Sequence, residues 1–260
     1  MTIAGTKRIT YFLPAPERVL CGTGRSSRIS LNPMSEHNPL LWLPPGLDVT
    51  VTRYGLGRVS PRLARVTDPG ALIDSVDAGA FGPDERFPYW SEVWPSSIAL
   101  GRFFAGGKSL AGTGAVELGC GLGLAGVTAA LRGADVIFSD YDPHAIAFAR
   151  VNHFLNLRKP GRTRLFDWRE PPGGLSAGLV IASDVLYEKR FVEPFLKTVE
   201  RILLPGGRAV VAEPGRKVAE GSLETLEEKG YRRSLSLEEF EFNGRPQAVW
   251  IHTLSKPVKR

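Results

Sequence analysis

The chain has 260 residues, of which 43% are hydrophobic and 23% are charged, a balance typical of a soluble globular protein. No apolar run approaches the roughly 18 residues of a membrane-spanning helix, and Pro14 and Pro16 make the first apolar stretch too short for a signal peptide. Two cysteines, Cys21 and Cys120, and four scattered histidines predict neither a disulfide framework nor a metal site, and they favour the cytoplasm.

The formal net charge is +6, but the basic residues are dispersed along the chain. No cluster of basic and aromatic residues stands out, so we expect solvated surface charge rather than a nucleic-acid or membrane partner. The sequence therefore points to a protein or a small molecule as the partner.

The first 80 residues form a segment of different character. Residues 1–45 are rich in Pro, Ser, Gly and Arg and are expected to be irregular or flexible. Residues 46–80 are expected to form a small extension, in which Leu47–Tyr54 and Leu63–Val66 pair as a β-hairpin. A short helix is predicted to begin at Asp68, with Pro69 at its first position.

An aromatic block follows at Phe87–Pro95, and its last residue opens a helix that is predicted to reach about Ala105. This block is open to two interpretations. It is either an aromatic lid packed on the edge of the core or a wall of a substrate pocket.

From Thr113 onward, short apolar strands alternate with helical segments, the pattern of a parallel sheet with helices on both faces. The fold class is thus α/β, a doubly wound, mostly parallel seven-stranded sheet whose two last strands form an antiparallel edge. The expected strands are Gly114–Leu118, Asp135–Ser139, Thr163–Phe166, Leu179–Ala182, Arg208–Ala212, Tyr231–Leu237 and Ala248–Leu254.

The segment Val116–Gly126 is the centre of the predicted site. An apolar strand ends in Glu117 and Leu118 and runs into Gly119, Gly121 and Gly123 before a helix. Glycine has no Cβ and accepts positive φ, so a ligand can lie against the bare backbone of such a turn.

Ligands of open α/β sheets bind outside the carboxyl ends of the strands, and here each of four strand ends carries an acid: Glu117, Asp140, Asp167 or Asp184. Buried carboxylates need partners, which indicates a ligand rich in hydrogen-bond donors, such as adenosine with an amino-acid tail. Asp140 follows the glycines by about 20 residues, the usual spacing for an acid that binds ribose hydroxyls.

A dinucleotide is the competing ligand. The spacing Gly119-x-Gly121-x-x-Leu124 lacks the third glycine of the dinucleotide motif, and Glu117 would repel a pyrophosphate. The zwitterionic tail of S-adenosylmethionine is tolerated there. S-adenosylmethionine is therefore the predicted cofactor.

The run from Glu117 to Gly123, with Asp140 and Asp167-Trp168 after it, resembles the motifs of class I, seven-strand S-adenosylmethionine-dependent methyltransferases with a Rossmann-like fold. Two further motifs, Pro88–Pro95 and Asp184-Val185-Leu186-Tyr187, are similar to those of protein-lysine methyltransferases such as the electron-transfer-flavoprotein β-subunit enzyme, with nicotinamide N-methyltransferase more distant. The resemblance covers residues 81–255 as one domain, followed by a basic tail at 256–260.

The resemblance implies a role for each motif residue. The methionine part of the cofactor contacts Glu117, Gly119, Gly121, Gly123 and, by analogy, Trp94; the ribose contacts Asp140; the adenine contacts Asp167 and Trp168. Asp184 and Tyr187 are expected to be catalytic and to receive the acceptor amine, and Asp184 also borders the cofactor. Two neighbours have plainer expected roles, Asp142 as a helix cap and Cys120 as inert filling.

Three functions follow from this resemblance. The first is methylation of a lysine amine on a protein substrate, by a chain expected to be monomeric. The second is N-methylation of a small molecule, in a pocket closed by residues 47–80, because the fold does not determine the acceptor. The third is a non-catalytic module that binds S-adenosylmethionine.

Overall fold

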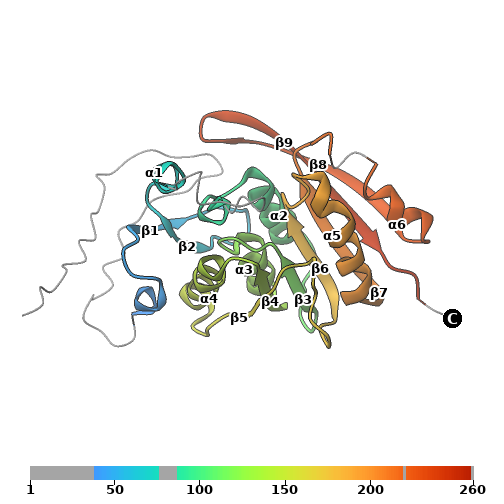
Figure 1. The fold of residues 1–260 in the computed structure, drawn as a ribbon, viewed down its shortest axis with the longest axis horizontal. Helices are drawn as coiled ribbons and strands as arrows, with labels where there is room; N and C mark the ends of the chain where they lie inside the picture. The colour runs from blue at the N-terminus through green and yellow to red at the C-terminus, as the bar shows by residue number, and fades with distance from the viewer. Residues whose placement is uncertain (1–37, 76–86, 219–220, 259–260) are drawn as a thin grey trace, which may run out of the picture.

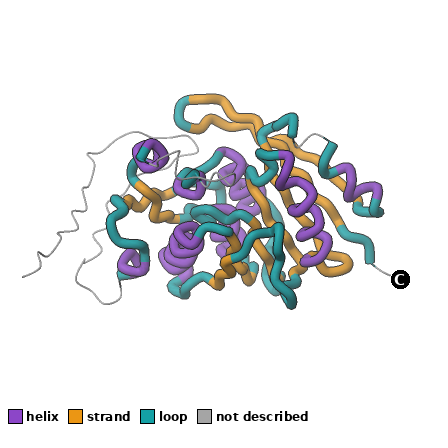
Figure 2. The backbone as a smooth tube through the Cα atoms, viewed as in Figure 1, coloured by secondary structure: helices purple, strands orange, loops and turns teal. Residues whose placement is uncertain are grey.

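The computed structural model describes residues 38–75, 87–218 and 221–258, which form two β-sheets with helices packed around them (Figure 1). The larger sheet has seven strands in the order β5-β4-β3-β6-β7-β9-β8. The smaller pairs β1 (Val49–Arg53) with β2 (Arg62–Val66). The tube in Figure 2 shows the large sheet as a band of strands between helical layers.

The large sheet confirms the predicted fold class. Its first five strands run parallel, and β9 pairs antiparallel with both β7 and β8. The strands are β3 (Gly114–Leu118), β4 (Asp135–Asp140), β5 (Arg162–Leu165), β6 (Ala177–Ser183), β7 (Leu203–Glu213), β8 (Arg232–Phe242) and β9 (Arg245–Ser255).

The last two strands are longer than the sequence pattern predicts, at 11 residues each. They are joined by Asn243 and Gly244, both with positive φ (51° and 71°), which suits the tight turn of a two-residue hairpin. The apolar alternation of β8, an edge strand that is largely exposed, is interrupted at Glu238-Glu239 before it resumes at Phe240 and Phe242. The pattern alone therefore ends the first strand too early and begins the second too late.

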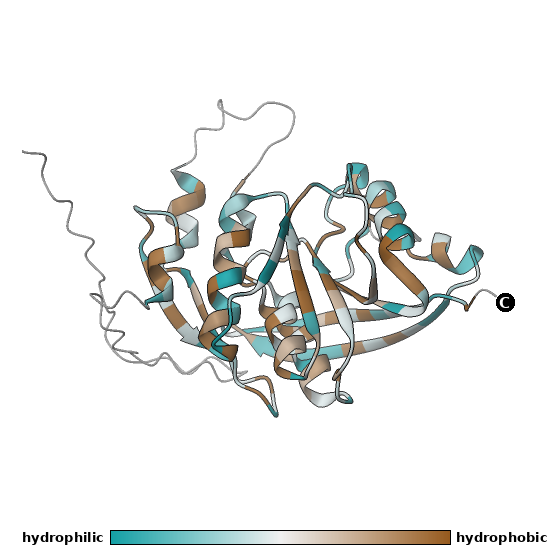
Figure 3. Ribbon diagram, turned by 90° about the horizontal axis from the view of Figure 1, so that it is seen from below, coloured by the Kyte–Doolittle hydropathy of each residue, from teal (hydrophilic) through white to brown (hydrophobic). Residues whose placement is uncertain are grey.

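Helices cover both faces of the sheet. One buried apolar cluster joins the sheet to α2 (Pro95–Gly106) and α3 (Leu124–Leu131), and a second joins it to α5 (Lys189–Ile202) and α6 (Glu224–Glu228). In Figure 3 the middle strands carry mostly the apolar colour and lie between helices on two sides. Every described helix is too short or too polar to cross a membrane.

The N-terminal extension packs mainly on α4 (Pro143–Leu157), and Phe240 and Phe242 of β8 pack against the same apolar cluster. Asn152 and Asn156 accept hydrogen bonds from the backbone N–H groups of Ala64 (2.7 Å) and Arg62 (2.9 Å) in β2. Asp68 caps the short helix α1 (Pro69–Asp74) through the N–H of Ala71. The extension is thus bound to the helix that follows β4.

Within the 1–45 segment expected to be irregular, residues 39–42 form a 3-10 helix, η1 (Pro39–Trp42), and the Trp42 ring lies edge-on to Phe154 of α4 at 5.1 Å. Residues 1–37, with Cys21, lie outside the described residues, as do 76–80 of the extension, 81–86 and 219–220 of the predicted main domain, and 259–260 of the basic tail. Figure 1 draws these ranges in grey.

Candidate active site

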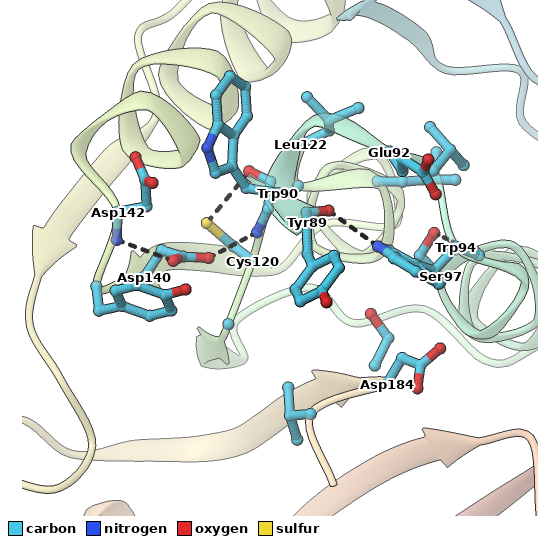
Figure 4. Close-up of a pocket in the computed structure, with 18 of the residues that line it drawn as sticks. Tyr89, Trp90, Glu92, Trp94, Ser97, Cys120, Leu122, Asp140, Asp142 and Asp184 are labelled. Carbon is cyan, nitrogen blue, oxygen red and sulfur yellow. Dashed lines mark hydrogen bonds between the residues drawn. The ribbon is translucent and has the colours of Figure 1, made fainter. Parts of the chain in front are cut away.

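A cleft opens at the carboxyl ends of β3, β4 and β6, with a volume of about 700 Å³ that includes space open to solvent. Figure 4 shows three parts of the chain around it: the aromatic block before α2, the glycine loop after β3 with the acids after β4, and the loop after β6. The lining residues are Tyr89, Trp90, Glu92, Val93, Trp94, Ser97, Gly119, Cys120, Gly121, Leu122, Gly123, Leu124, Asp140, Tyr141, Asp142, Trp168, Ser183, Asp184, Val185 and Tyr187.

The glycine loop has the backbone conformation that its sequence requires. Gly119, Gly121 and Gly123 all have positive φ, at 64°, 49° and 76°. A Cβ on Gly119 would lie 2.8 Å from the Val185 side chain and 3.1 Å from the Trp168 ring. Glycine is needed here both for the left-handed backbone and for the close approach of these two side chains.

Asp140, the last residue of β4, fixes the glycine loop from the side. Its Oδ2 accepts the N–H of Gly121 at 2.9 Å, and its Oδ1 accepts the N–H of Asp142 at 3.0 Å. Burial raises the pKa of Asp140 to about 6, so it is mostly ionised at neutral pH. Asp142 caps α4 by accepting the N–H of His144 at 2.7 Å, as the sequence predicts.

Glu117 lies beneath the glycine loop and is not among the residues that line the cleft. Its side chain is buried at 1% exposure, and its Oε1 accepts the N–H of Gly126 in α3 at 3.1 Å. Its Oε2 has no partner among the described residues, and burial raises its pKa to about 8. The structure therefore does not bring Glu117 into the cofactor cleft, where the sequence expects it, and its contact with the methionine part remains a prediction.

Of the pair expected to hold the adenine, only Trp168 lines the cleft. Its ring lies edge-on to Phe195 of α5 at 6.0 Å, and its Nε1 is buried with no partner among the described residues. Asp167 instead accepts hydrogen bonds from the backbone and side chain of Arg169, at 2.8 Å and 2.6 Å. Although Asp167 and Trp168 are consecutive in the chain, their side chains have different neighbours in the turn after β5, and only Trp168 lines the cleft. Sequence adjacency could not show this difference.

The aromatic block forms a wall of the cleft, and its role as a wall of a substrate pocket remains a prediction. The Trp94 indole donates to the carbonyl oxygen of Tyr89 at 3.0 Å, and the Tyr89 ring lies edge-on to both Trp94 and Tyr187 at 6.1 Å. Tyr187 also packs on Phe191 of α5 at 5.6 Å. Burial raises the pKa of Tyr187 to about 12, so its hydroxyl remains a donor at neutral pH.

Asp184 lies at the start of the loop after β6, at the opposite end of the close-up from Asp140 (Figure 4). It has a left-handed backbone with φ of 55°, and its N–H donates to the carbonyl of Ala212 in β7 at 2.9 Å. Its Oδ1 accepts from Nε of Arg216 at 2.8 Å. Sequence reasoning missed Arg216, although its place just after the next parallel strand, β7, is a signal that could have found it.

The residues of the cleft fit S-adenosylmethionine. The glycine loop leaves backbone exposed where a side chain would collide, and the Asp140 carboxylate lines the cleft, where it can accept a ribose hydroxyl. The Trp168 ring, whose Cζ3 edge lies against Gly119, and the other aromatic rings give a flat base an apolar wall. A strand order with an antiparallel final pair and a glycine loop after the central strand define a class I methyltransferase.

Comparison with known proteins gives the particular family. The profile described as "Lysine methyltransferase" matches residues 89–227, more than half of the chain, and the chain belongs to this family. The matched region contains the aromatic block from Tyr89 onward, the glycine loop, Asp140 and the Asp184–Tyr187 motif. S-adenosylmethionine is the cofactor that this family membership and the cleft both indicate.

The curated relatives include enzymes with different acceptors. The chain is 32% identical to the electron transfer flavoprotein beta subunit lysine methyltransferase of Xenopus laevis, over 50% of this chain and 53% of that one. It is also 32% identical to protein N-lysine methyltransferase METTL21A of Danio rerio (42% and 54%) and to histone-arginine methyltransferase METTL23 of Homo sapiens (41% and 60%). The chain spans about half the length of the first two relatives.

Solved structures with a similar fold are more distant in sequence. The N-methyltransferase NodS from Bradyrhizobium japonicum, in complex with S-adenosyl-L-homocysteine, aligns with a TM-score of 0.48 and 16% identity, covering 57% of this chain and 82% of that one. The putative RNA methyltransferase PH1948 from Pyrococcus horikoshii aligns with a TM-score of 0.43 and 20% identity, covering 57% and 77%.

Proposed function

We propose that this chain transfers a methyl group from S-adenosylmethionine to the side-chain amine of a lysine on a protein substrate. The observation that carries the proposal is the meeting of Asp184 and Tyr187 with Tyr89 and Trp94 in one cleft, which the glycine loop and Asp140 also line. Family membership and the lysine methyltransferases among the relatives support the same acceptor.

The two ends of the cleft suit the two reactants. The bare backbone of the glycine loop and the Asp140 carboxylate suit a nucleoside at one end, while aromatic rings and Asp184 lie at the other. An amine on a long methylene chain fits the second end, because aromatic faces attract the positive charge that develops as nitrogen gains a methyl group. This division gives each reactant its own part of the cleft.

The cofactor, when bound, supplies an electrophilic methyl group on its sulfonium. The protein must hold the neutral amine about 3 Å from that carbon, in line with the bond that breaks. Asp184 accepts a hydrogen bond from the amine and directs its lone pair, and the Tyr187 ring packs along the methylene chain. Methylation forms the N–C bond, breaks the C–S bond and leaves an ammonium, which releases its proton to water.

Labelling tests the proposal directly. The purified chain is incubated with S-adenosylmethionine that carries a radioactive methyl group and with a lysate of the source cells, and the products are separated into proteins and small molecules. The expected result is label in a protein, at a residue that mass spectrometry identifies as methyl-lysine. Label in small molecules alone, or on arginine, would contradict it.

Small-molecule N-methylation is the alternative. It requires elements that close over the acceptor, and residues 47–80 were the candidate for that role. Among the described residues of this extension, none lines the cleft, because β2 is bound to α4 through Asn152 and Asn156. The described part of the extension thus leaves the acceptor end uncovered, and this supports a protein-borne lysine that enters from solvent.

The proposal also places the chain in the cytoplasm as a monomer. The buried Cys120 thiol, whose pKa is raised by burial, lies between two glycines of the loop. A reducing compartment keeps such a thiol unmodified. Fractionation of the source cells and light scattering of the purified chain test these two statements.

A further inference from the structure

Arg216 lies next to the acceptor end of the cleft, on the loop that follows β7. Its Nε donates to Oδ1 of Asp184 at 2.8 Å, and the two residues come from the ends of the adjacent strands β7 and β6. The Asp184 side chain is only 6% exposed, while that of Arg216 is 37% exposed. The nearly buried carboxylate of Asp184 therefore lines the cleft while it is paired with the guanidinium of Arg216.

The loop that carries Arg216 is fixed by Glu213, the last residue of β7. Its Oε2 accepts the N–H groups of Gly215 at 2.6 Å and Arg216 at 2.9 Å, and its Oε1 lies 3.3 Å from Nε2 of His252 in β9. Burial works against the charge, but the hydrogen bonds, that of His252 first, keep the pKa of Glu213 below its usual value. Glu213 stays ionised and holds the backbone from which Arg216 reaches Asp184.

The backbone of Asp184 is also fixed in place. Its left-handed backbone, with φ of 55°, places its N–H on the carbonyl of Ala212, one residue before Glu213. The ends of β6 and β7 are thus joined by a backbone hydrogen bond and by the Asp184–Arg216 ion pair. This double connection sets the carboxylate and the guanidinium relative to one another.

The electrostatic surroundings make Arg216 important. The charged residues that line the cleft, within the described part of the chain, are Glu92, Asp140, Asp142 and Asp184, and all are acidic. An amine placed among carboxylates is stabilised as an ammonium, which has no lone pair for attack. A cation beside Asp184 opposes this effect because it repels a second positive charge.

Building on the proposed function, we propose that Arg216 keeps the acceptor amine neutral by balancing the charge of Asp184. Asp184 can then orient the amine through a hydrogen bond without holding it as an ammonium. Arg216 contacts Asp184 rather than the reacting atoms, so it is a positioning residue.

Other titratable groups face this end of the cleft. Tyr89 and Glu92 come from the segment before α2, and Tyr187 and Glu188 from the loop after β6, while Asp140 of β4 lies at the opposite, cofactor end. Glu188 is paired with Arg190 at 2.7 Å, and His252 lies behind Glu213. None of these groups supplies a cation to Asp184, whose ion pair is with Arg216.

The test compares kcat from about pH 6 to about pH 10, with saturating S-adenosylmethionine and with the purified lysine-bearing protein identified by labelling as the substrate. The pH profile of kcat is the one to measure because it reports ionisations in the enzyme–substrate complex, where the amine lies beside Asp184. In Arg216→Gln, the acidic limb of the profile should move up by about one pH unit, which lowers activity about tenfold at pH 7 and restores it at high pH. Arg216→Lys keeps the charge and should keep the wild-type limb. Arg102→Gln removes an arginine of α2 that has similar exposure (35%) and is paired with Glu238 of β8, and it should change nothing.

Two results would overturn the role of Arg216. One is a loss of activity in Arg216→Gln by the same factor at every pH, which indicates a purely structural role. The other is an acidic limb of the pH profile that moves as far in Arg216→Lys as in Arg216→Gln. A wild-type chain that methylates no lysine would refute the proposed function instead. Thermal melting of each variant separates a folding defect from either outcome, and the lysine variant keeps the test available if the glutamine variant unfolds.

Discussion

The two ends of the cleft are built in different ways. At the cofactor end, the geometry is set mainly by backbone groups. Three glycines with positive φ form the loop, and both oxygens of Asp140 accept hydrogen bonds from backbone N–H groups. At the acceptor end, the geometry is set by side chains. Rings from two distant segments lie edge-on to one another, and Asp184 pairs with Arg216, 32 residues later in the chain.

This difference teaches how each end can vary. A loop fixed by main-chain hydrogen bonds tolerates little change, because a Cβ on Gly119 meets Val185 and Trp168. An end made of side chains can be rebuilt by substitution while the fold stays intact, which agrees with relatives named for lysine and for arginine acceptors. The comparison therefore predicts that variants at the two ends fail in different measurements.

The largest expected effect is at the acceptor end. Asp184→Asn should lower kcat by about 1,000-fold, because the amide cannot orient the amine as the carboxylate does. Asparagine tolerates the left-handed backbone at this position, so the loop should be retained. Affinity for S-adenosylmethionine, measured by calorimetry, should stay within about threefold of wild type. A variant with normal kcat would remove Asp184 from the catalytic role.

At the cofactor end, Asp140→Ala should weaken S-adenosylmethionine binding by about 100-fold, or about 2.7 kcal/mol, since it leaves the N–H groups of Gly121 and Asp142 unpaired and removes the ribose acceptor. Calorimetry measures the loss. Asp135→Ala, at the exposed start of the same strand, removes only a surface ion pair with Arg162 and is the matched control. Equal affinities in the two variants would remove Asp140 from the cofactor site.

Two variants of Tyr187 separate the contribution of its ring to the reaction rate from that of its hydroxyl. Tyr187→Leu should lower kcat/KM by about tenfold, because the ring face near the developing positive charge is lost. Tyr187→Phe keeps the ring and its contacts with Tyr89 and Phe191, and should lose only about threefold. Steady-state kinetics measure both. If phenylalanine costs as much as leucine, the hydroxyl is the important group.

The smallest effect on binding is expected for Glu117→Gln, with affinity for S-adenosylmethionine within about threefold of wild type, because Glu117 lies outside the cleft lining. Its effect is on the pH dependence of stability. Burial raises the pKa of Glu117 to about 8 in the folded chain, so the stability it contributes is complete at low pH and is lost as pH rises through about 8.

Denaturant unfolding therefore provides the measurement. In wild type the free energy of unfolding should fall between about pH 6.5 and pH 8, above the range in which Asp140, with a pKa of about 6, titrates. Glu117→Gln should flatten this part of the curve. A large loss of cofactor affinity in the same variant would instead support the contact with the methionine part that the motif implies.

The sequence by itself determined the fold class and the cofactor end of the cleft, because both depend on patterns within short, continuous stretches of the chain. Strand–helix alternation predicts the parallel sheet, and a glycine loop after one strand with an acid after the next predicts Gly119, Gly121, Gly123 and Asp140 in one cleft. Local backbone requirements fix these positions, so periodicity and spacing are enough to find them.

Only the tertiary structure decided which side chains face the cleft and which do not. It places Glu117 under the loop, turns Asp167 toward Arg169, makes the aromatic block a wall of the cleft and brings Arg216 onto Asp184. These outcomes depend on packing between segments that are distant in the chain. The physical reason is that side-chain direction at a strand end is set by neighbouring strands and helices, which local sequence does not specify.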